Sequence, residues 1–244
     1  MNDTTPPLVL IHPPRSVPAR RGWVWLKDGL AYFLRAPLMW QGIIALVFAM
    51  SISIALIPIV GGIANALLPP VLGAGLMVVC HTLHSGNDAR WQQLFSGFGP
   101  AFKPLVFSGL LLLLLQVVAI LLLVGPSNLA MMATGDAEQL GSAMATNPML
   151  LLIRLALMVA FMVPITAATL FSPALIMLGG LPIIDAIKAS IKACFMNAAP
   201  LLLWGAIAIA LTLIGLIPAG LGMLVVLPVL VASGYLGFRD IFVD

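Results

Sequence analysis

Six long apolar runs divide the chain, and shorter segments with mixed polarity precede three of them. The apolar runs cover residues 38–57, 61–83, 105–124, 149–178, 201–217 and 221–236. A helix needs about 20 apolar residues to cross roughly 30 Å of hydrocarbon, and it satisfies every backbone hydrogen bond internally. The run LLLLLLQVVAILLLV lacks the alternation of a barrel strand. The pattern predicts an all-α integral membrane protein with six transmembrane helices, and the shortness of the last two leaves open a hairpin that stops short of the far face.

Three segments, 23–35, 91–98 and 184–195, have the spacing of amphipathic helices. Each is too short and too polar on one side to cross a bilayer, so we expect it to lie in the cytoplasmic interface. Asp88 is the expected N-cap of the second segment. The apolar stripes of the first and third are Trp23, Leu26, Leu30 and Phe33, and Ile184, Ile187, Ile191 and Phe195. The residues assigned to the lipid interface are Arg20, Arg21, Lys27, Arg35, Lys188, Lys192, Trp23 and Trp91.

The few charges indicate how the chain is oriented. Hydrophobic residues make up 62% of the sequence and charged residues 8%, which excludes a soluble globule. Cations gather before the first run, between the second and third, between the fourth and fifth, and after the sixth. Residues 125–148 carry Asp136 and Glu138 and no Lys or Arg, so the positive-inside rule places both termini in the cytoplasm of a bacterial inner membrane. We attribute the basic excess to this topology and expect no nucleic-acid partner.

The junction between an amphipathic segment and an apolar run occurs twice, as YFLRAPLMWQG at 32–42 and CFMNAAPLLLWG at 194–205. The turn sequence LIP and a P-x-L element in the returning runs recur as well. We therefore predict three repeats, each an interfacial amphipathic helix followed by a transmembrane hairpin. The repeats span about 20–85, 86–179 and 180–244 of a single transmembrane domain, 20–244. Residues 1–19 are predicted to form a flexible, proline-rich cytoplasmic tail.

Three prolines inside the returning runs, Pro70, Pro173 and Pro228, are predicted helix-break positions. Each removes one backbone hydrogen bond. The carbonyls that they free lie near Ala66, Thr169 and Leu224. In many transporters such carbonyls form a site at the membrane midplane. The sequence favours the alternative that the prolines kink helices for packing, with Thr169, Ser172 or water satisfying the carbonyls.

Arg154 is a cation within the fourth run, roughly 7 Å deep at the helical rise. It either extends to the periplasmic headgroups or turns inward toward Gln116. Asn65 joins these two residues in a candidate intramembrane polar site for an anionic headgroup. Small residues at Gly73–Gly75 and at 232–234 are expected where helices approach closely.

The sequence contains no set of side chains suited to catalysis, so we expect no enzyme. Cys80 and His84 share a helical face near Asp88, but two ligands and a distant carboxylate make a poor metal site. We expect no catalytic residues, no metal and no cofactor. Both cysteines lie near predicted cytoplasmic ends, where thiols stay reduced.

The segments GWVWLKDGLAYFLRAPLMW, LIPIVGG, LLPPVLGAGLM, FSPALIMLGGLPIIDAIKASIKAC and GYLGFRDIF, in this order, resemble a family of uncharacterised proteobacterial inner-membrane proteins. The resemblance covers residues 17–242. More distantly, the plan of interfacial helix and hairpin resembles the membrane domain of bacterial glycerophosphodiester phosphodiesterases, without their catalytic domain. The sequence favours a non-catalytic scaffold or accessory subunit that binds anionic lipid and a membrane-protein partner. The alternative is a small transporter or lipid-translocating protein that uses the proline-broken helices.

Overall fold

The computed structural model describes residues 8–11, 13–57, 60–124 and 148–243, and within these ranges the regular structure is helical. The α-helices are α1 Arg21–Arg35, α2 Pro37–Ala55, α3 Val60–His84, α4 Phe102–Val124, α7 Pro148–Leu170, α8 Ser172–Met177, α9 Ile183–Met196, α10 Ala198–Leu216 and α11 Met223–Phe242, and η1 Trp91–Phe98 is a 3₁₀ helix.

Six of these stretches are long and apolar enough to cross a membrane, which confirms the predicted spans. They are α2, α3, α4, α7 together with α8, α10 and α11. The helix of the fourth span is interrupted at Phe171, so this span consists of α7 and the six-residue α8. The acidic segment used for the topology prediction lies, but for Pro148, outside the described residues.

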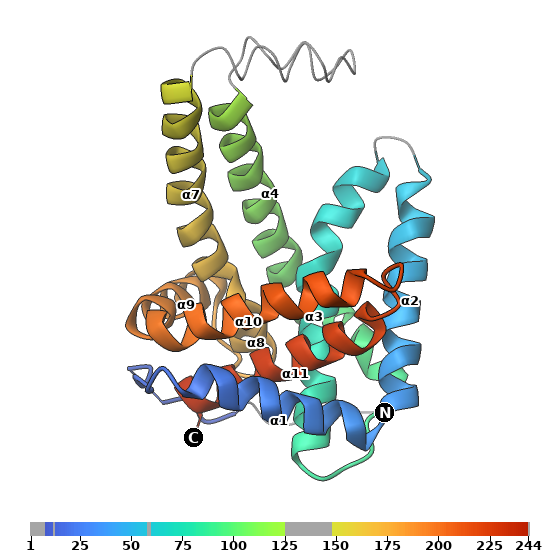
Figure 1. Ribbon diagram of the computed structural model, residues 1–244. Helices are drawn as coiled ribbons and strands as arrows, with labels where there is room; N and C mark the ends of the chain where they lie inside the picture. Colours follow the sequence, from blue (N-terminus) through green and yellow to red (C-terminus); the bar gives the residue numbers. More distant parts are fainter. Residues whose placement is uncertain (1–7, 12, 58–59, 125–147, 244) are drawn as a thin grey trace.

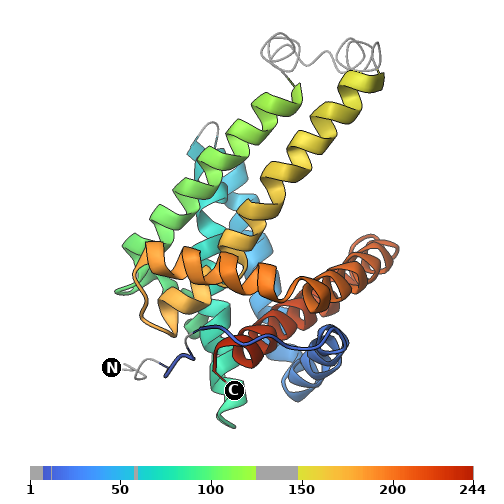
Figure 2. The same ribbon diagram turned by 90° about the vertical axis from the view of Figure 1, so that its left-hand side faces the viewer.

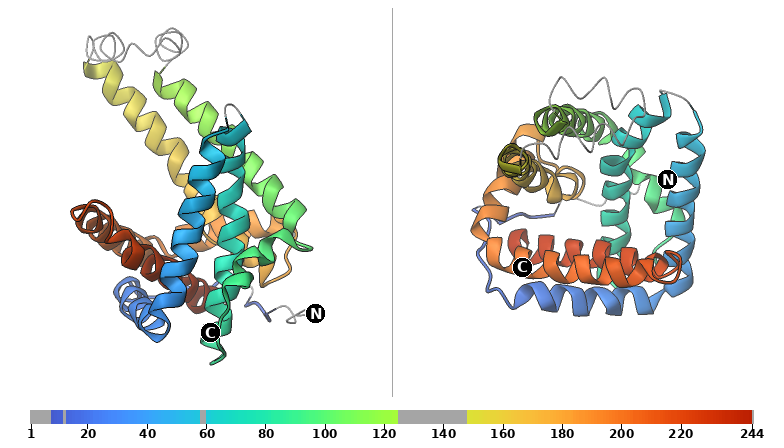
Figure 3. Two further views of the ribbon diagram at one scale, coloured as in Figure 1. Left: turned by 90° about the vertical axis from the view of Figure 1, so that its right-hand side faces the viewer. Right: turned by 45° about the horizontal axis from the view of Figure 1, so that its top comes forward.

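The three pairs of long helices do not run in one direction (Figure 1). Helices α4 and α7 stand side by side, while α10 and α11 cross their direction. Figure 2 shows that the end of α4 at Val124 and the start of α7 at Pro148 point away from the C-terminus. The right-hand view of Figure 3 shows α1 running alongside α10 and α11. The third hairpin is therefore splayed from the other two.

Each short helix packs mainly on a returning helix: η1 and α9 on that of the hairpin before them, and α1 on that of the last hairpin. Helix α1 packs on α11, η1 on α3, and α9 on α7 and α8. The contacts of these short helices with the hairpin that follows them in the sequence are much sparser. Because α1 is the first helix and α11 the last, their contact joins the two ends of the chain.

Small residues make these contacts close. A Cβ at Gly29 of α1 would lie 2.8 Å from the Val229 carbonyl oxygen and 3.0 Å from the Ser233 nitrogen, both on α11. Between α3 and η1, Gly75 faces the Leu94 carbonyl and Gly97 faces that of Val71. The buried face of α9 consists of Ala186, Ser190 and Ala193. Small residues let helix backbones approach in this way inside a membrane.

Among the described residues, more large apolar side chains are exposed than buried. In α9, Ile184 is 65% exposed and Phe195 is also exposed, as expected for an apolar stripe that faces lipid. In α1 the predicted stripe is divided: Trp23 and Leu30 are exposed, whereas Leu26 and Phe33 are buried. The glycines of α1 cause this division, because Gly22 and Gly29 define the face that approaches α10 and α11.

Two local features differ from the predictions. The segment 91–98 is a 3₁₀ helix and not an α-helix. Its N-cap is Arg90 and not Asp88, because the Gln93 side chain accepts a hydrogen bond from the Arg90 backbone nitrogen at 3.1 Å.

The described part of the predicted tail lies across helix ends. Backbone nitrogens of residues 8, 11 and 15 donate to the carbonyls of Leu178, Phe242 and Ile241. The Val17 nitrogen donates to the Asn197 side chain at 2.8 Å, and that side chain donates back to the Arg15 carbonyl. These bonds hold residues 8–17 against the ends of α9 and α11 and the loop after α8.

Candidate intramembrane polar site

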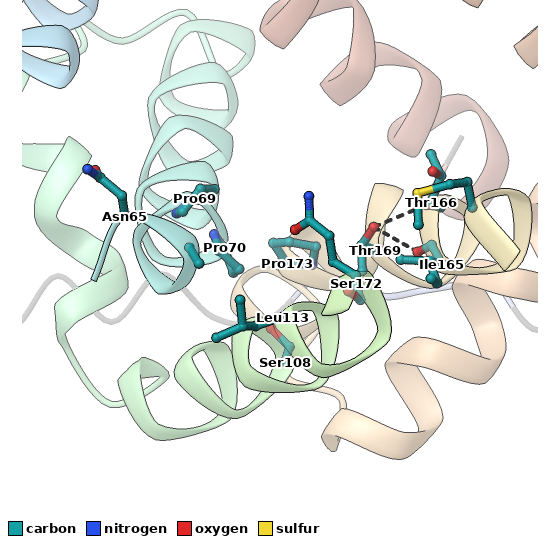
Figure 4. Close-up of a pocket in the computed structure, with 13 residues that line it drawn as sticks. Asn65, Pro69, Pro70, Ser108, Leu113, Ile165, Thr166, Thr169, Ser172 and Pro173 are labelled. Atoms are coloured by element: carbon teal, nitrogen blue, oxygen red, sulfur yellow. Dashed lines mark hydrogen bonds between the residues drawn. The ribbon is translucent and has the colours of Figure 1, made fainter. Parts of the chain in front are cut away.

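A cavity of about 510 Å³ lies between α3, α4, α7 and α8 (Figure 4). Most of its lining is apolar, but amides and hydroxyls are interspersed, and none of these described lining residues is charged. The residues are Asn65, Ala66, Pro69, Pro70, Ser108, Leu113, Gln116, Met162, Ile165, Thr166, Thr169, Ser172 and Pro173. The first and second hairpins thus border a half-open pocket that carries amide and hydroxyl groups, and none of its described lining residues is charged.

Prolines supply part of the polarity of this cavity. Pro69 and Pro70 lie inside α3, where proline cannot donate to the carbonyl four residues earlier. The carbonyls that lose their donors are those of Asn65 and Ala66, and both residues line the cavity. Pro173 follows the break before α8 and likewise cannot donate to the carbonyl of Thr169, which also lines it. The carbonyls of Asn65, Ala66 and Thr169 thus cannot accept a hydrogen bond from the residue four positions later, and all three residues line the same cavity.

Of three hydroxyl groups at the cavity, two donate hydrogen bonds to backbone carbonyls and the third has no partner among the described residues. Ser108 donates to the Leu105 carbonyl at 2.7 Å, and Thr169 donates to the Ile165 carbonyl at 3.0 Å. Ser172 is only 1% exposed, and among the described residues its Oγ has no hydrogen-bond partner. A buried hydroxyl without a partner is costly, by roughly 1–3 kcal/mol. A ligand in the cavity would remove this cost.

The structure brings together part of the predicted polar site. Asn65 and Gln116 both line the cavity, and the Asn65 amide donates to the Ser51 carbonyl of α2 at 3.0 Å. Arg154 does not line it: on α7 it precedes Met162 by eight residues, or about 12 Å along the helix. The predicted arrangement of Arg154 beside Gln116 and Asn65 is therefore not the one that this cavity shows.

The three predicted helix-break prolines also separate. Pro70 and Pro173 line the cavity, but Pro228 lies inside α11 and does not. Helices α3 and α11 continue through Pro70 and Pro228. The fourth span, in contrast, has a helix break at Phe171, just before Pro173. Proximity of the first two could not be read from the sequence, because it depends on how α3 packs against α8.

The residues assigned to the lipid interface are mostly exposed. Trp23 and Trp91 are each 55% exposed. Among the basic residues assigned to the lipid interface, those that are exposed are Arg20, Lys27, Arg35, Lys188 and Lys192. Arg21 differs, because its guanidinium forms an ion pair with Asp240.

A cluster of charges around the buried Asp240 was not predicted from the sequence. The carboxylate accepts hydrogen bonds from Arg21 and from the Trp25 indole nitrogen, the latter at 2.9 Å, and lies 3.6 Å from Arg15. Partners more than 200 residues apart leave no local signal in the sequence. The cluster fixes α1 and the preceding segment to the end of α11.

A second unpredicted group joins α1, α3 and α11. The Tyr32 hydroxyl is hydrogen-bonded to Nδ1 of His84, and Nδ1 of His81 lies 3.0 Å from the Tyr235 hydroxyl. Burial raises the pKa of Tyr32. Across the described part of the chain, no three His, Cys, Asp or Glu side chains gather at a potential metal site. His84, which shares a helical face with Cys80, is hydrogen-bonded to the Tyr32 hydroxyl.

Comparison with known proteins points to the same class of protein. The chain is 25% identical over 226 residues, 90% of its length and 82% of the relative's, to a Burkholderia thailandensis protein named "Probable inner membrane protein". No family model matches the chain, and no solved structure matches it. Together with the six membrane-length helices, this similarity fits a polytopic inner-membrane protein. The more distant resemblance to phosphodiesterase membrane domains stays a prediction.

Proposed function

We propose that the protein is a non-catalytic scaffold or accessory subunit of the bacterial inner membrane, which binds lipid and a membrane-protein partner. The observation that carries this proposal is the exposed set of cations and tryptophans on the short helices α1, η1 and α9 and the residues that precede them. These helices lie around the lower half of the molecule in Figure 1. Each basic residue near an anionic bilayer surface contributes about 1 kcal/mol to lipid attraction.

The orientation that we propose places this set and both termini in the cytoplasm. The C-terminus and α1 lie at one end of the molecule, and the free ends of α4 and α7 lie at the other (Figure 1). Single cysteines introduced as Ser16→Cys and Ser127→Cys test it in intact cells, after removal of the two native thiols. A membrane-impermeant maleimide should label the second and not the first. Equal labelling of both without permeabilisation would refute the orientation.

The threefold repeat is part of the same proposal. Each of the three short helices packs through small residues on a returning helix of another proposed unit. Such equivalent contacts support three related units of short helix and hairpin. They would also distribute the lipid-facing helices around the protein.

Lipid binding can be tested with purified full-length protein in nanodiscs. Native mass spectrometry would compare retention of phosphatidylglycerol with that of phosphatidylcholine. The variant combining Lys27→Gln, Lys188→Gln and Lys192→Gln should lose anionic-lipid affinity by roughly 100-fold, at about 1 kcal/mol for each charge. Arg154→Gln, which removes one cation from α7, is the single-charge comparison and should lower affinity by no more than about fivefold, or about 1 kcal/mol. Unchanged retention by the triple variant would reject the proposal.

Lipid translocation is a second candidate, and the cavity with three proline-freed carbonyls favours it. Broken or proline-containing helices that meet at a polar cavity are a feature of transporters. The test is fluorescent-lipid redistribution in reconstituted vesicles. Rates equal to those of protein-free vesicles would exclude translocation and leave the scaffold role.

A further inference from the structure

We infer that the cavity between α3, α4, α7 and α8 binds a lipid headgroup that donates hydrogen bonds and has no net negative charge. This inference rests on the proposed role as a lipid-binding membrane protein, and it names the lipid class for one site. The chemical groups that fit are a primary ammonium, as in phosphatidylethanolamine, and a free hydroxyl, as in diacylglycerol.

The cavity has an excess of hydrogen-bond acceptors. Pro69, Pro70 and Pro173 cannot donate to the carbonyls of Asn65, Ala66 and Thr169, and these three residues line the cavity. A carbonyl inside a membrane protein needs a donor from the protein, a ligand or water. The Ser108 and Thr169 hydroxyls already donate to backbone carbonyls, which leaves their oxygens as further acceptors. The complementary ligand group is a donor.

The buried Ser172 hydroxyl also indicates a ligand. Its Oγ has no partner among the described residues, although it is almost fully buried at the cavity. Buried polar groups in native proteins are nearly always hydrogen-bonded, so an unpaired one marks a place for a ligand or water. The hydroxyl can accept from an ammonium or exchange hydrogen bonds with a ligand hydroxyl.

The absence of charge from the described lining residues narrows the class of ligand. A phosphate or carboxylate in the cavity would meet carbonyl oxygens, and none of these lining residues is a Lys or Arg that could neutralise it. The prediction that the polar site holds an anionic headgroup depended on Arg154, which lies elsewhere on α7. A zwitterionic lipid would therefore place only its ammonium among the carbonyls.

The size of the cavity favours a headgroup over a bare ion. Its volume of about 510 Å³ lies within the roughly 300–1,000 Å³ typical of small-molecule sites. A dehydrated alkali cation would need its oxygen ligands to close around it. A headgroup can instead reach several carbonyls while its acyl chains remain among the exposed apolar helices.

The test uses full-length protein in nanodiscs and native mass spectrometry with four defined lipids. Phosphatidylethanolamine and phosphatidylcholine have the same charge, but only the first donates hydrogen bonds from its head nitrogen. Diacylglycerol and triacylglycerol form the corresponding pair for the hydroxyl. We expect retention of the donor in at least one pair to exceed that of its non-donor control by tenfold or more. The pair that shows the difference identifies the source of the donor, and equal retention within both pairs would overturn the inference.

Two substitutions locate the binding to the cavity. In Pro70→Ala the new backbone N–H would donate to the Ala66 carbonyl and remove that acceptor, while strengthening α3. Ser172→Ala removes an unpaired hydroxyl at little cost to folding. Each should weaken donor-lipid retention by roughly threefold to tenfold, the equivalent of about one hydrogen bond. Pro228→Ala makes the same backbone change in α11, away from the cavity, and should leave retention unchanged.

The outcomes separate this inference from the proposed function. The inference would be overturned if both cavity variants retained the donor lipid as wild type does, or if Pro228→Ala lost it equally. Thermal stability is measured for every variant to detect misfolding. Anionic-lipid retention governed by Lys27, Lys188 and Lys192 would still support the scaffold role. Loss of that dependence with intact donor-lipid selectivity would instead reject the scaffold role and support donor-lipid binding in the cavity.

Discussion

Two glycines of α3, Gly73 and Gly75, test whether the contact with η1 depends on close backbone approach. A Cβ at Gly75 would overlap the Leu94 carbonyl group and lie 2.9 Å from the Leu94 Cα. A Cβ at Gly73 would meet nothing within 4 Å. Gly75→Ala therefore forces α3 and η1 apart, whereas Gly73→Ala adds a methyl group in open space. The two substitutions are chemically identical and two residues apart on one helix.

The difference in stability between the two variants measures the cost of the steric overlap at Gly75. Both gain roughly 1 kcal/mol of helix propensity when alanine replaces glycine, so this effect cancels. Overlap in a packed contact costs about 1–3 kcal/mol, because the neighbouring backbone must shift. For a chain of this length about 2–4 °C of Tm corresponds to each kcal/mol, so Gly75→Ala should melt roughly 2–12 °C below Gly73→Ala.

Thermal unfolding in one detergent, followed by circular dichroism, measures this difference. Hydrogen exchange of residues 91–98 adds a local readout, since weaker docking of η1 should raise its exchange rate while α10 stays unchanged. Equal Tm values and equal exchange for the two variants would refute the assignment of Gly75 to a close contact.

Three further predictions concern other contacts. Asp240→Asn should raise hydrogen exchange in residues 8–17 by roughly fivefold, for a loss of about 1 kcal/mol from ion pairs with partly exposed arginines; unchanged exchange would contradict the anchoring role. Burial raises the pKa of the Cys194 thiol to about 11, and because only the thiolate reacts, alkylation at pH 8 should be roughly 100-fold slower than for a thiol of pKa 9 and rise with pH toward 11. A rate at pH 8 like that of a free thiol would contradict this. Trp204→Phe removes the 2.8 Å hydrogen bond to Ser233 and should lower stability in a denaturation assay by about 0.5–1.5 kcal/mol, whereas wild-type stability would show that this bond contributes nothing.

The sequence predicted the six spans well, because the physics of crossing a bilayer is local. Twenty apolar residues with no charge near the middle define a span without knowledge of its neighbours. The same locality explains why Pro70 and Pro173 could be recognised as sources of free carbonyls. Their meeting in one cavity depends on the packing of α3 against α8, which no local pattern encodes.

The faces of the short helices were harder to predict. In α1 the decisive residues are Gly22 and Gly29, which approach the backbones of α10 and α11. A search for apolar stripes gives glycine no weight, although its spacing of seven residues was a usable signal. In water, large apolar side chains mark the buried face; in lipid they are equally stable outside, so small residues mark it instead.

The short helices pack across the boundaries of the predicted repeats. Cuts at 85/86 and 179/180 follow the sequence repeat, but they separate η1 from α3 and α9 from α7, its main contacts. A compact unit is better described as a hairpin with the short helix that follows it. By this division the third hairpin has no short helix of its own, and α1 fills that place from the other end of the chain, fixed there through Asp240. In this way α1 connects the third hairpin to the first, because it packs on α11 and leads directly into α2.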